Sequence, residues 1–444
     1  MNKETNVSQH ELVKVAVVGC WHQGVVGAGC MAELGYDVTG YDPDAGRVAK
    51  LAEGSAPLYE PGLDELLGKG LKEGRLAFTG NLERAVRGAR YVMVMFDTPV
   101  DENDQSDLSG IFAAFEQMAP LLDSGVAIYV TAQVPVGTCR KLDKLLREKN
   151  TALKFHLAYS PENLRLGQAI ERFMKPALPV IGSDDPAALD AVEELFRPLN
   201  VKWERVNLCT AEMVKHALNA FLATSVCFAN EIGNICDEVG ADGSRLAQVL
   251  RLEPRIGSKA LLLPGLGFSG GTLARDMQTL RGLGDRFNIQ TLLLDGAWDS
   301  NQIQNQLVVR KMRKALGGLT GKTIAVLGLT YKPDTSTLRR SASLQIIRDL
   351  NREGAQVRAH DPKADRGELK SLSGFEFFED VYEAVRGAEA VVIVTGWPEY
   401  KQLDFAKIKG LTAGPVLLDT NNMLNAGSLL ALGFMYMDIG RGRG

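Results

Sequence analysis

The sequence has no long apolar segment and no excess of basic charge. No run of about 18 apolar residues occurs, so we expect no membrane-spanning helix. The first twelve residues are polar and include acids, unlike the basic-then-apolar layout of a secretory signal peptide. The formal net charge is −4 over 444 residues, which argues against nucleic acid or a membrane surface as a partner. We therefore predict a cytoplasmic protein.

Cysteine and histidine are scarce and scattered. The chain has five histidines and six cysteines without a Cys-x-x-Cys pair, so it lacks the spacing of a zinc site. We expect no metal, and we expect reduced thiols, as is usual in the cytoplasm. The cysteines are Cys20, Cys30, Cys139, Cys209, Cys227 and Cys236.

The N-terminal part has the pattern of an α/β domain. Residues 13–19 are a β-branched run ending in glycine, a helix of small residues extends to Leu34, and a second strand at 37–41 ends in Asp42. This βαβ order opens a doubly wound sheet. Because 444 residues exceed one ordinary core, we place the first domain at residues 1–200. Further strand patterns occur at 91–95, 127–130 and 155–159.

A proline-free helical pattern follows at residues 211–239 and would span roughly 44 Å at about 1.5 Å per residue. Such a helix suits a dimer seam or an interdomain spine, so we expect a homodimer or a higher homo-oligomer. A second strand–turn–helix pattern begins at Lys322. The sequence thus predicts an α/β protein with two Rossmann-like doubly wound domains, joined by a central helical domain with one long helix. The predicted boundaries are 201–319 for the helical domain and 320–444 for the last domain.

The first turn resembles a dinucleotide-binding turn with one defect. Gly19 and Gly24 are suitably spaced, and Asp42 follows Gly19 by 23 residues, where an acid binds the adenosine ribose and favours NAD over NADP. Trp21 replaces the glycine that normally lets the backbone approach the pyrophosphate. Its side chain must point away, or it displaces the cofactor. The turn is either an altered NAD pocket, which we favour, or a turn that no longer binds a dinucleotide.

Several motifs in a fixed order resemble one known family. Residues 264–276 are a glycine-rich loop ending in Asp276, residues 160–165 are Ser-Pro-Glu-Asn-Leu-Arg, and Lys215 and Asn219 lie one helical turn apart. Together they are similar to the nucleotide-sugar dehydrogenases, the UDP-glucose/GDP-mannose dehydrogenase family, over nearly the whole chain. The resemblance implies NAD as cofactor and a nucleoside-diphosphate sugar, with a UDP-hexose favoured, as substrate.

The resemblance also implies roles for individual residues. Implied catalytic residues are Lys215, Asn219, Asp276, Glu162 and Thr272. Implied cofactor contacts are Gly19, Trp21, Gly24, Asp42, Thr98 and Arg339. Implied substrate contacts are Asn163, Leu164, Arg255, Gly267, Phe268, Gly271 and Lys332, with Arg255 reaching the sugar of a neighbouring subunit. Taken singly, Lys215 is typical of a solvated helix lysine and Asp276 of a helix N-cap.

Thr272 stands where the resembling family has its catalytic cysteine. Oxidising an alcohol requires removal of a hydride and a proton, which an aspartate and a lysine can assist. Oxidising the resulting aldehyde requires a nucleophile that is also a leaving group, and threonine is poor at both. Cys227 lies eight residues beyond Asn219, about 12 Å along the helix, and cannot replace the loop thiol.

Other departures from the family pattern accompany the missing thiol. Leu166 replaces a glutamate, Ala132-Gln133 replaces Ser-Thr, and Asn421 stands where an arginine near the nucleotide is expected. The glycines of the 264–276 loop should let backbone amides approach a phosphate or sugar.

Three functions remain open at the level of sequence. The leading hypothesis is one two-electron oxidation of a nucleotide sugar, or a redox-neutral, epimerase-like cycle that returns the hydride. The second is ordinary UDP-glucose 6-dehydrogenase activity giving UDP-glucuronate. The third is a non-catalytic nucleotide-sugar-binding homologue.

Overall fold

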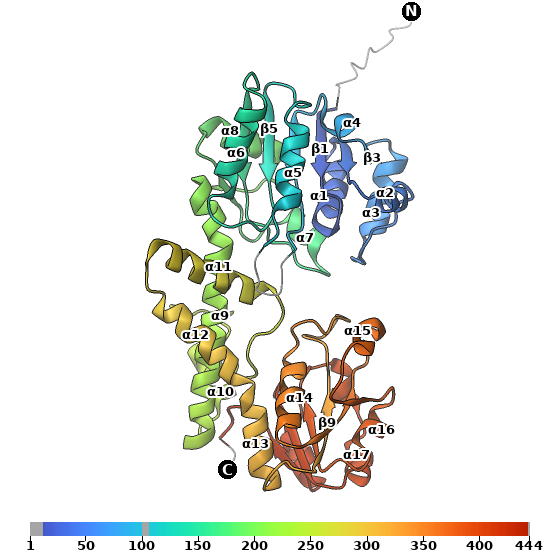
Figure 1. The fold of residues 1–444 in the computed structure, drawn as a ribbon, viewed down its shortest axis with the longest axis vertical. Coiled ribbons are helices and arrows are strands. Elements are labelled where there is room, and N and C mark those ends of the chain that lie inside the picture. The colour runs from blue at the N-terminus through green and yellow to red at the C-terminus, as the bar shows by residue number, and fades with distance from the viewer. Residues whose placement is uncertain (1–11, 100–105, 443–444) are drawn as a thin grey trace, which may run out of the picture. The chain divides into compact units, whose positions relative to one another are not determined.

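The computed structural model describes residues 12–99 and 106–442 (Figure 1). The chain divides into two compact units, residues 1–217 and 218–444, and each unit is described by itself. Among the described residues, no helix combines the length and apolarity needed to cross a membrane. The same residues hold no cluster of three or more metal-ligating side chains.

The first unit is built on an eight-stranded sheet with the order β3-β2-β1-β4-β5-β6-β7-β8. Neighbouring strands pair in parallel except β6 and β7, which pair antiparallel. The strands are β1 (Lys14–Val18), β2 (Asp37–Tyr41), β3 (Leu76–Thr79), β4 (Tyr91–Val94), β5 (Val126–Val130), β6 (Phe155–Tyr159), β7 (Val180–Gly182) and β8 (Glu204–Val206). Strand order reverses between β1 and β4, which is where open α/β sheets bind their ligands.

Helices cover both faces of this sheet, because its central strands are apolar on both sides. The helices are α1 (His22–Glu33), α2 (Ala45–Ala52), α3 (Leu63–Lys72), α4 (Leu82–Val86), α5 (Ser109–Met118), α6 (Thr138–Lys149), α7 (Ala169–Met174) and α8 (Pro186–Leu195). Small residues let α1 lie close to the sheet, since a Cβ on Gly27 would fall 2.5 Å from the sulfur of Met95. This contact packs the middle of α1 against the residue that follows β4.

The long helix α9 (Leu208–Val239) begins in the first unit and ends in the second. It has 32 residues and starts three residues before the predicted position. Its first turns are anchored by Glu212, whose fully buried carboxylate accepts hydrogen bonds from the amides of Gly137 and Cys139 at 2.6 and 2.7 Å. These contacts between distant segments explain why the sequence pattern alone placed the start of the helix too late.

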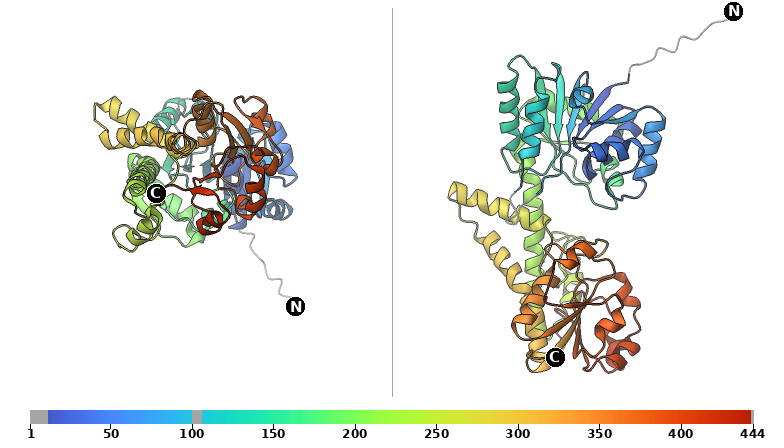
Figure 2. Two further views of the ribbon diagram at one scale, coloured as in Figure 1. Left: turned by 90° about the horizontal axis from the view of Figure 1, so that it is seen from below. Right: turned by 45° about the vertical axis from the view of Figure 1, so that its right-hand side comes forward.

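The second unit combines a helical part with a smaller sheet (Figure 2). The helical part contains α9, α10 (Gly243–Leu250), α11 (Thr272–Phe287), α12 (Leu292–Gln304) and α13 (Gln306–Leu316). One apolar cluster joins Ala223 and Cys227 of α9 to Met277 of α11 and Ala297 of α12. These contacts hold the start of α11 beside α9.

The sheet of the second unit is parallel throughout, with the order β11-β10-β9-β12-β13-β14. Its strands are β9 (Thr323–Leu327), β10 (Gln356–His360), β11 (Glu376–Phe377), β12 (Ala390–Ile393), β13 (Val416–Asp419) and β14 (Met435–Met437), and its helices are α14 (Ala342–Arg352), α15 (Arg366–Lys370), α16 (Val381–Val385), α17 (Phe405–Leu411) and α18 (Ala426–Ala431). The predicted fold class, two Rossmann-like sheets and a helical part with one long helix, is confirmed.

Candidate functional site

The turn between β1 and α1 has the geometry of a dinucleotide-binding turn. Gly19 has φ +94°, a left-handed conformation that favours glycine. A Cβ on Gly24 would lie 1.7 Å from the carbonyl oxygen of Gly19, so Gly24 is needed for the close turn. Asp42, at the end of β2, accepts a hydrogen bond from the amide of Cys20 at 3.0 Å. The predicted residues Gly19, Trp21, Gly24 and Asp42 therefore lie at one place.

Trp21 fits this turn without backbone strain. Its φ of −82° and ψ of −150° are ordinary extended values. The ring is 40% exposed and stacks on Arg47, whose guanidinium carbon lies 4.8 Å from the ring centroid. Arg47 also pairs with Asp42 at 2.7 Å, and Asp42 is only 2% exposed. The indole thus rests on the Asp42 side of the turn, where Arg47 holds it.

The end of β4 contributes two further polar contacts near the turn. The hydroxyl of Thr98 donates to the carbonyl of Gln133 at 2.8 Å. The side-chain nitrogen Nε2 of Gln23, the second residue of α1, donates to a carboxylate oxygen of Asp97 at 3.1 Å. Sequence reasoning singled out Thr98 but missed Gln23, whose only signal was a polar residue inside the glycine motif.

Glu162 and Lys215 are held together within the first unit. The ammonium of Lys215 lies 3.7 Å from a carboxylate oxygen of Glu162, and Lys215 is 8% exposed. The other Glu162 oxygen accepts from the amide of Leu164. The interpretation of Lys215 as a solvated helix lysine is therefore wrong, because its side chain is buried beside a carboxylate.

Glu60 anchors the segment that carries Glu162. This buried carboxylate accepts from the amides of Gly167 and Ala169, each at 2.8 Å, and lies 3.2 Å from His22 Nε2. Glu60 lies just before α3, which has Gly62 in the left-handed conformation at its start. The amides that Glu60 binds lie 107 and 109 residues further along the chain.

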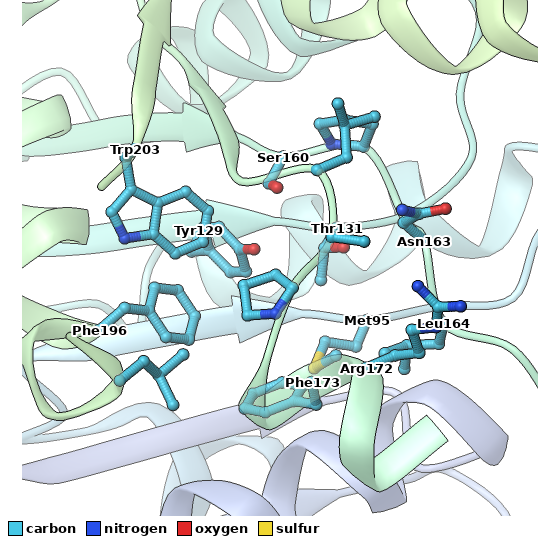
Figure 3. Close-up of a pocket in the computed structure, with 15 residues that line it drawn as sticks. Met95, Tyr129, Thr131, Ser160, Asn163, Leu164, Arg172, Phe173, Phe196 and Trp203 are labelled. Atoms are coloured by element: carbon cyan, nitrogen blue, oxygen red, sulfur yellow. The ribbon is translucent and has the colours of Figure 1, made fainter. Parts of the chain in front are cut away.

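A small cavity lies beside residues 160–164, among the ends of β4, β5 and β6 (Figure 3). Its volume is about 60 Å³, enough for a few water molecules at about 10–15 Å³ each. Thr131, Ser160 and Asn163 contribute polar groups to its lining, and the rest is largely apolar. The predicted substrate residues Asn163 and Leu164 are part of this lining.

In the second unit, Asn219 and Asp276 form a buried pair. The Asn219 amide nitrogen donates to a carboxylate oxygen of Asp276, and the two residues are 5% and 0% exposed. Gly271 is the N-cap of α11, so the interpretation of Asp276 as a helix cap is wrong. Thr272 is the exposed first residue of α11, one turn before Asp276 on the same face.

Four backbone amides of the glycine-rich loop donate hydrogen bonds to other residues of the protein. Its amides at 265, 267, 268 and 270 donate to Asn230, Asn305, Asn301 and the carbonyl of Arg340. A Cβ on Gly267 would lie 2.7 Å from Asn301, and one on Gly270 would lie 2.9 Å from the ring of Tyr331. These four amides are therefore used within the protein in this structure, while the expectation that the loop approaches a phosphate or sugar stays a prediction.

The remaining predicted residues of the second unit have contacts of their own. The Arg255 side chain is 88% exposed and pairs with Glu253 at 2.8 Å. The Lys332 ammonium lies 5.4 Å from the centroid of the Tyr331 ring, and Arg339 is exposed. Asn421, where an arginine was expected, donates to the carbonyl of Val394 at 3.0 Å. Gly271 lies beside Arg340, whose guanidinium would be 3.2 Å from an added Cβ.

Most of the thiols are poorly suited to act as nucleophiles. Burial raises the pKa of Cys30 to about 12 and that of Cys227 to about 11. Burial also raises the pKa of Cys20, Cys139 and Cys236. Cys227 further donates to the carbonyl of Ala297 at 3.1 Å. These thiols stay protonated at neutral pH, and the protonated form is not the reactive one.

Three family models match consecutive parts of the chain. Residues 13–200 match the NAD binding domain of the UDP-glucose/GDP-mannose dehydrogenase family. Residues 209–303 match the central domain of that family, and residues 325–426 match its UDP binding domain.

Curated proteins and solved structures agree with these models. The chain is 35% identical to UDP-glucose 6-dehydrogenase TuaD of Bacillus subtilis, covering 96% of this chain and 93% of that protein. It is also 35% identical to UDP-glucose 6-dehydrogenase of Rhizobium meliloti, covering 97% and 100%. A UDP-glucose dehydrogenase structure from Pyrobaculum islandicum is similar with a TM-score of 0.84 at 29% identity, covering 98% and 99%. A UDP-D-ManNAc dehydrogenase structure from Pyrococcus horikoshii has a TM-score of 0.84 at 26% identity, covering 97% and 100%.

Proposed function

Because the chain belongs to the UDP-glucose/GDP-mannose dehydrogenase family and uses NAD as its cofactor, we propose that it oxidises a nucleoside-diphosphate sugar by a single two-electron step. The expected substrate is a UDP-hexose. The observation that carries this proposal is the combination of two buried polar pairs, Lys215–Glu162 and Asn219–Asp276, with threonine at position 272.

The residues of the first turn fit NAD. Gly19 and Gly24 make the tight turn, the start of α1 suits a pyrophosphate, and Asp42 stands at the end of β2 for the adenosine ribose. NAD supplies the acceptor for the hydride when it is bound. The protein must therefore supply the groups that orient the sugar and take up its proton.

We assign the proton to Asp276. Its carboxylate is fully buried, and the Asn219 amide fixes one of its oxygens, so its orientation is set before substrate binds. We assign to Lys215 the stabilisation of the developing alkoxide, because its ammonium carries the opposite charge and Glu162 holds it in place. Both roles belong to the first oxidation, and neither needs a thiol.

Thr272 does not support the second oxidation, in which the aldehyde is oxidised. Capturing the aldehyde needs a nucleophile that ionises near neutral pH, and an alcohol does not. The protonated thiols of Cys227 and Cys30 offer no substitute. The expected product is therefore a keto- or aldehydo-sugar rather than a uronate.

A redox-neutral cycle is a second candidate. Arg47 pairs with Asp42 and stacks on the Trp21 indole, and a ring held at this turn could lie against a bound dinucleotide and favour its retention through turnover. NAD held there would supply a reversible hydride acceptor. Hydride returned to the opposite face of the oxidised carbon would give an epimer without net oxidation.

The direct test is to incubate the purified protein with NAD and a panel of UDP- and GDP-hexoses, and to weigh the products. One oxidation lowers the sugar mass by about 2 units, full oxidation raises it by about 14, and epimerisation leaves it unchanged while altering chromatographic retention. A mutant with Asp276→Asn should give no product and serves as the control. A uronate formed at high rate by the wild-type protein would contradict the proposal.

We also propose that the protein forms a dimer through α9. Phe221, Phe228 and Ile235 are 70%, 50% and 56% exposed and repeat every seven residues. Residues seven apart lie on nearly the same face of a helix. A second copy of this helix offers an apolar face of the same pattern, which supports a symmetric contact.

A further inference from the structure

Gln23 carries a buried acceptor that the protein leaves unused. The residue is 7% exposed, and its Nε2 donates to Asp97 Oδ1 at 3.1 Å. Its Oε1 is enclosed and has no hydrogen-bond partner among residues 12–99 and 106–442. The bond to a carboxylate fixes which end of the amide is nitrogen, because Asp97 accepts from the nitrogen. A buried polar atom without a partner is rare in folded proteins and costs stability.

The position of Gln23 relates this acceptor to the cofactor. Gln23 is the second residue of α1, directly after the glycine turn, and Asp97 follows β4. β1 and β4 are neighbours at the point where strand order reverses. The Gln23–Asp97 hydrogen bond therefore bridges the crevice in which a Rossmann-like sheet binds its dinucleotide. The unused oxygen belongs to the side chain that makes this bridge.

The chemistry of NAD matches what this oxygen lacks. The oxygen can only accept, and NAD carries hydroxyl donors on both riboses and amino donors on its carboxamide and adenine. A residue whose role was only to fill space at this helix start would be apolar, as its buried neighbours Val25 and Val26 are. The bond from Nε2 to Asp97 keeps the oxygen of this glutamine close to the glycine turn.

We propose that Gln23 is a cofactor-binding residue whose side-chain oxygen accepts a hydrogen bond from an N–H or O–H group of bound NAD. Binding then includes a small rotation of the amide, because the oxygen is enclosed in this structure. The inference concerns the cofactor alone and does not depend on which sugar is oxidised or on how often.

The test measures NADH binding to the full-length protein, freed of nucleotide and without sugar, by NADH fluorescence. Gln23→Met removes the acceptor at similar volume and should weaken NADH binding about tenfold, the loss of one good hydrogen bond. Its melting temperature without nucleotide should change little, since the substitution removes an unsatisfied buried oxygen together with the hydrogen bond to Asp97. Gln23→Val, a smaller apolar residue, should act in the same direction if the methionine variant folds poorly.

Two matched variants separate this role from a structural one. Gln304 is a buried glutamine whose two amide atoms both have partners, Asn234 and the carbonyl of Gly265. Gln304→Met should lower the melting temperature and leave NADH affinity unchanged. Asp97→Asn keeps an acceptor for Gln23 Nε2 and should leave NADH affinity within about twofold of wild type, well short of the change expected from one lost hydrogen bond.

The proposal is overturned by either of two results. One is an unchanged NADH affinity in both Gln23 variants, which would mean that water or nothing fills the acceptor. The other is an equal loss of affinity in Asp97→Asn, which would mean that the glutamine acts only by holding Asp97.

Discussion

At the scale of single residues, two side chains that the sequence suggests are exposed are in fact buried. Lys215 and Asp276 are both buried and paired, so each charge has a defined direction. Such pairs are costly to build and are weak evidence for stability. Their presence in both units therefore favours a chemical role over a structural one.

Trp21 offers a prediction about cofactor release. The indole stacks on Arg47, which pairs with Asp42, so we expect the ring to lie over the adenosine ribose of bound NAD and to slow its release. Removing a cation–π contact of about 0.5–1 kcal/mol should speed NADH dissociation about threefold in Trp21→Gly, measured by a stopped-flow chase. Trp298→Phe is the matched control, because Trp298 in α12 also stacks with an arginine. The guanidinium carbon of Arg281 lies 5.5 Å from the centroid of its ring. An unchanged dissociation rate in Trp21→Gly would contradict the covering role.

Because Cys227 is buried in the folded state, we expect the free energy of unfolding to depend on pH. Its pKa rises from 9.0 to about 11 on folding, chiefly by burial, so the folded state binds this proton more tightly than the unfolded state. The stabilisation is complete below pH 9 and is lost as pH rises toward 11. The melting temperature should fall across this window, and it should fall less in Cys227→Ala. Parallel curves for the two proteins would show that the thiol does not contribute.

At the scale of elements, Glu60 links α1, α3 and the segment before α7. Its two short bonds to the amides of Gly167 and Ala169 hold the chain just after Arg165, which is exposed. Glu60→Ala should loosen this segment and speed tryptic cleavage after Arg165 by roughly tenfold, as expected for the loss of charged hydrogen bonds. Glu171→Ala, an exposed residue on α7, is the control. Equal cleavage of both variants would contradict the anchoring role.

The elements also show how far sequence reasoning reached. Strand patterns located β1, β2 and β6 to within a residue or two. Only β1 is a nearly continuous apolar run, as is typical of a buried parallel strand. The short strands β7, β8 and β11 were missed, since two or three residues carry no periodic pattern. The glycine turn and Asp42 were predictable because their geometry is local.

The candidate site was only partly predictable for the opposite reason. The sequence singled out Lys215, Asn219 and Asp276, but their burial depends on distant partners and could not be read from spacing. Glu60 and Gln23 were not recognised, because their partners lie 107 and 74 residues away. The loop glycines were assigned to a ligand, whereas Gly267 and Gly270 make room for Asn301 and Tyr331.

At the scale of the whole molecule, the proposed dimer gives a further prediction. Phe228 lies in the middle of the exposed apolar row on α9 and is 50% exposed. A charge there should not unfold one copy but should oppose burial against a second. Phe228→Glu should shift the mass measured by light scattering from a dimer or larger to a monomer. Leu430→Glu, at an equally exposed site in α18, should leave the mass unchanged, and a monomeric wild-type protein would contradict the proposal.

The account centres on the number of hydrides removed from each sugar. The most direct measurement is the NADH formed per UDP-hexose consumed, for wild type and for Thr272→Cys, with products identified by mass. The account predicts at most one NADH and no uronate for wild type. It predicts a rise above one in Thr272→Cys, where a thiol can capture the aldehyde. Two NADH per sugar with a uronate product from the wild-type protein would contradict it.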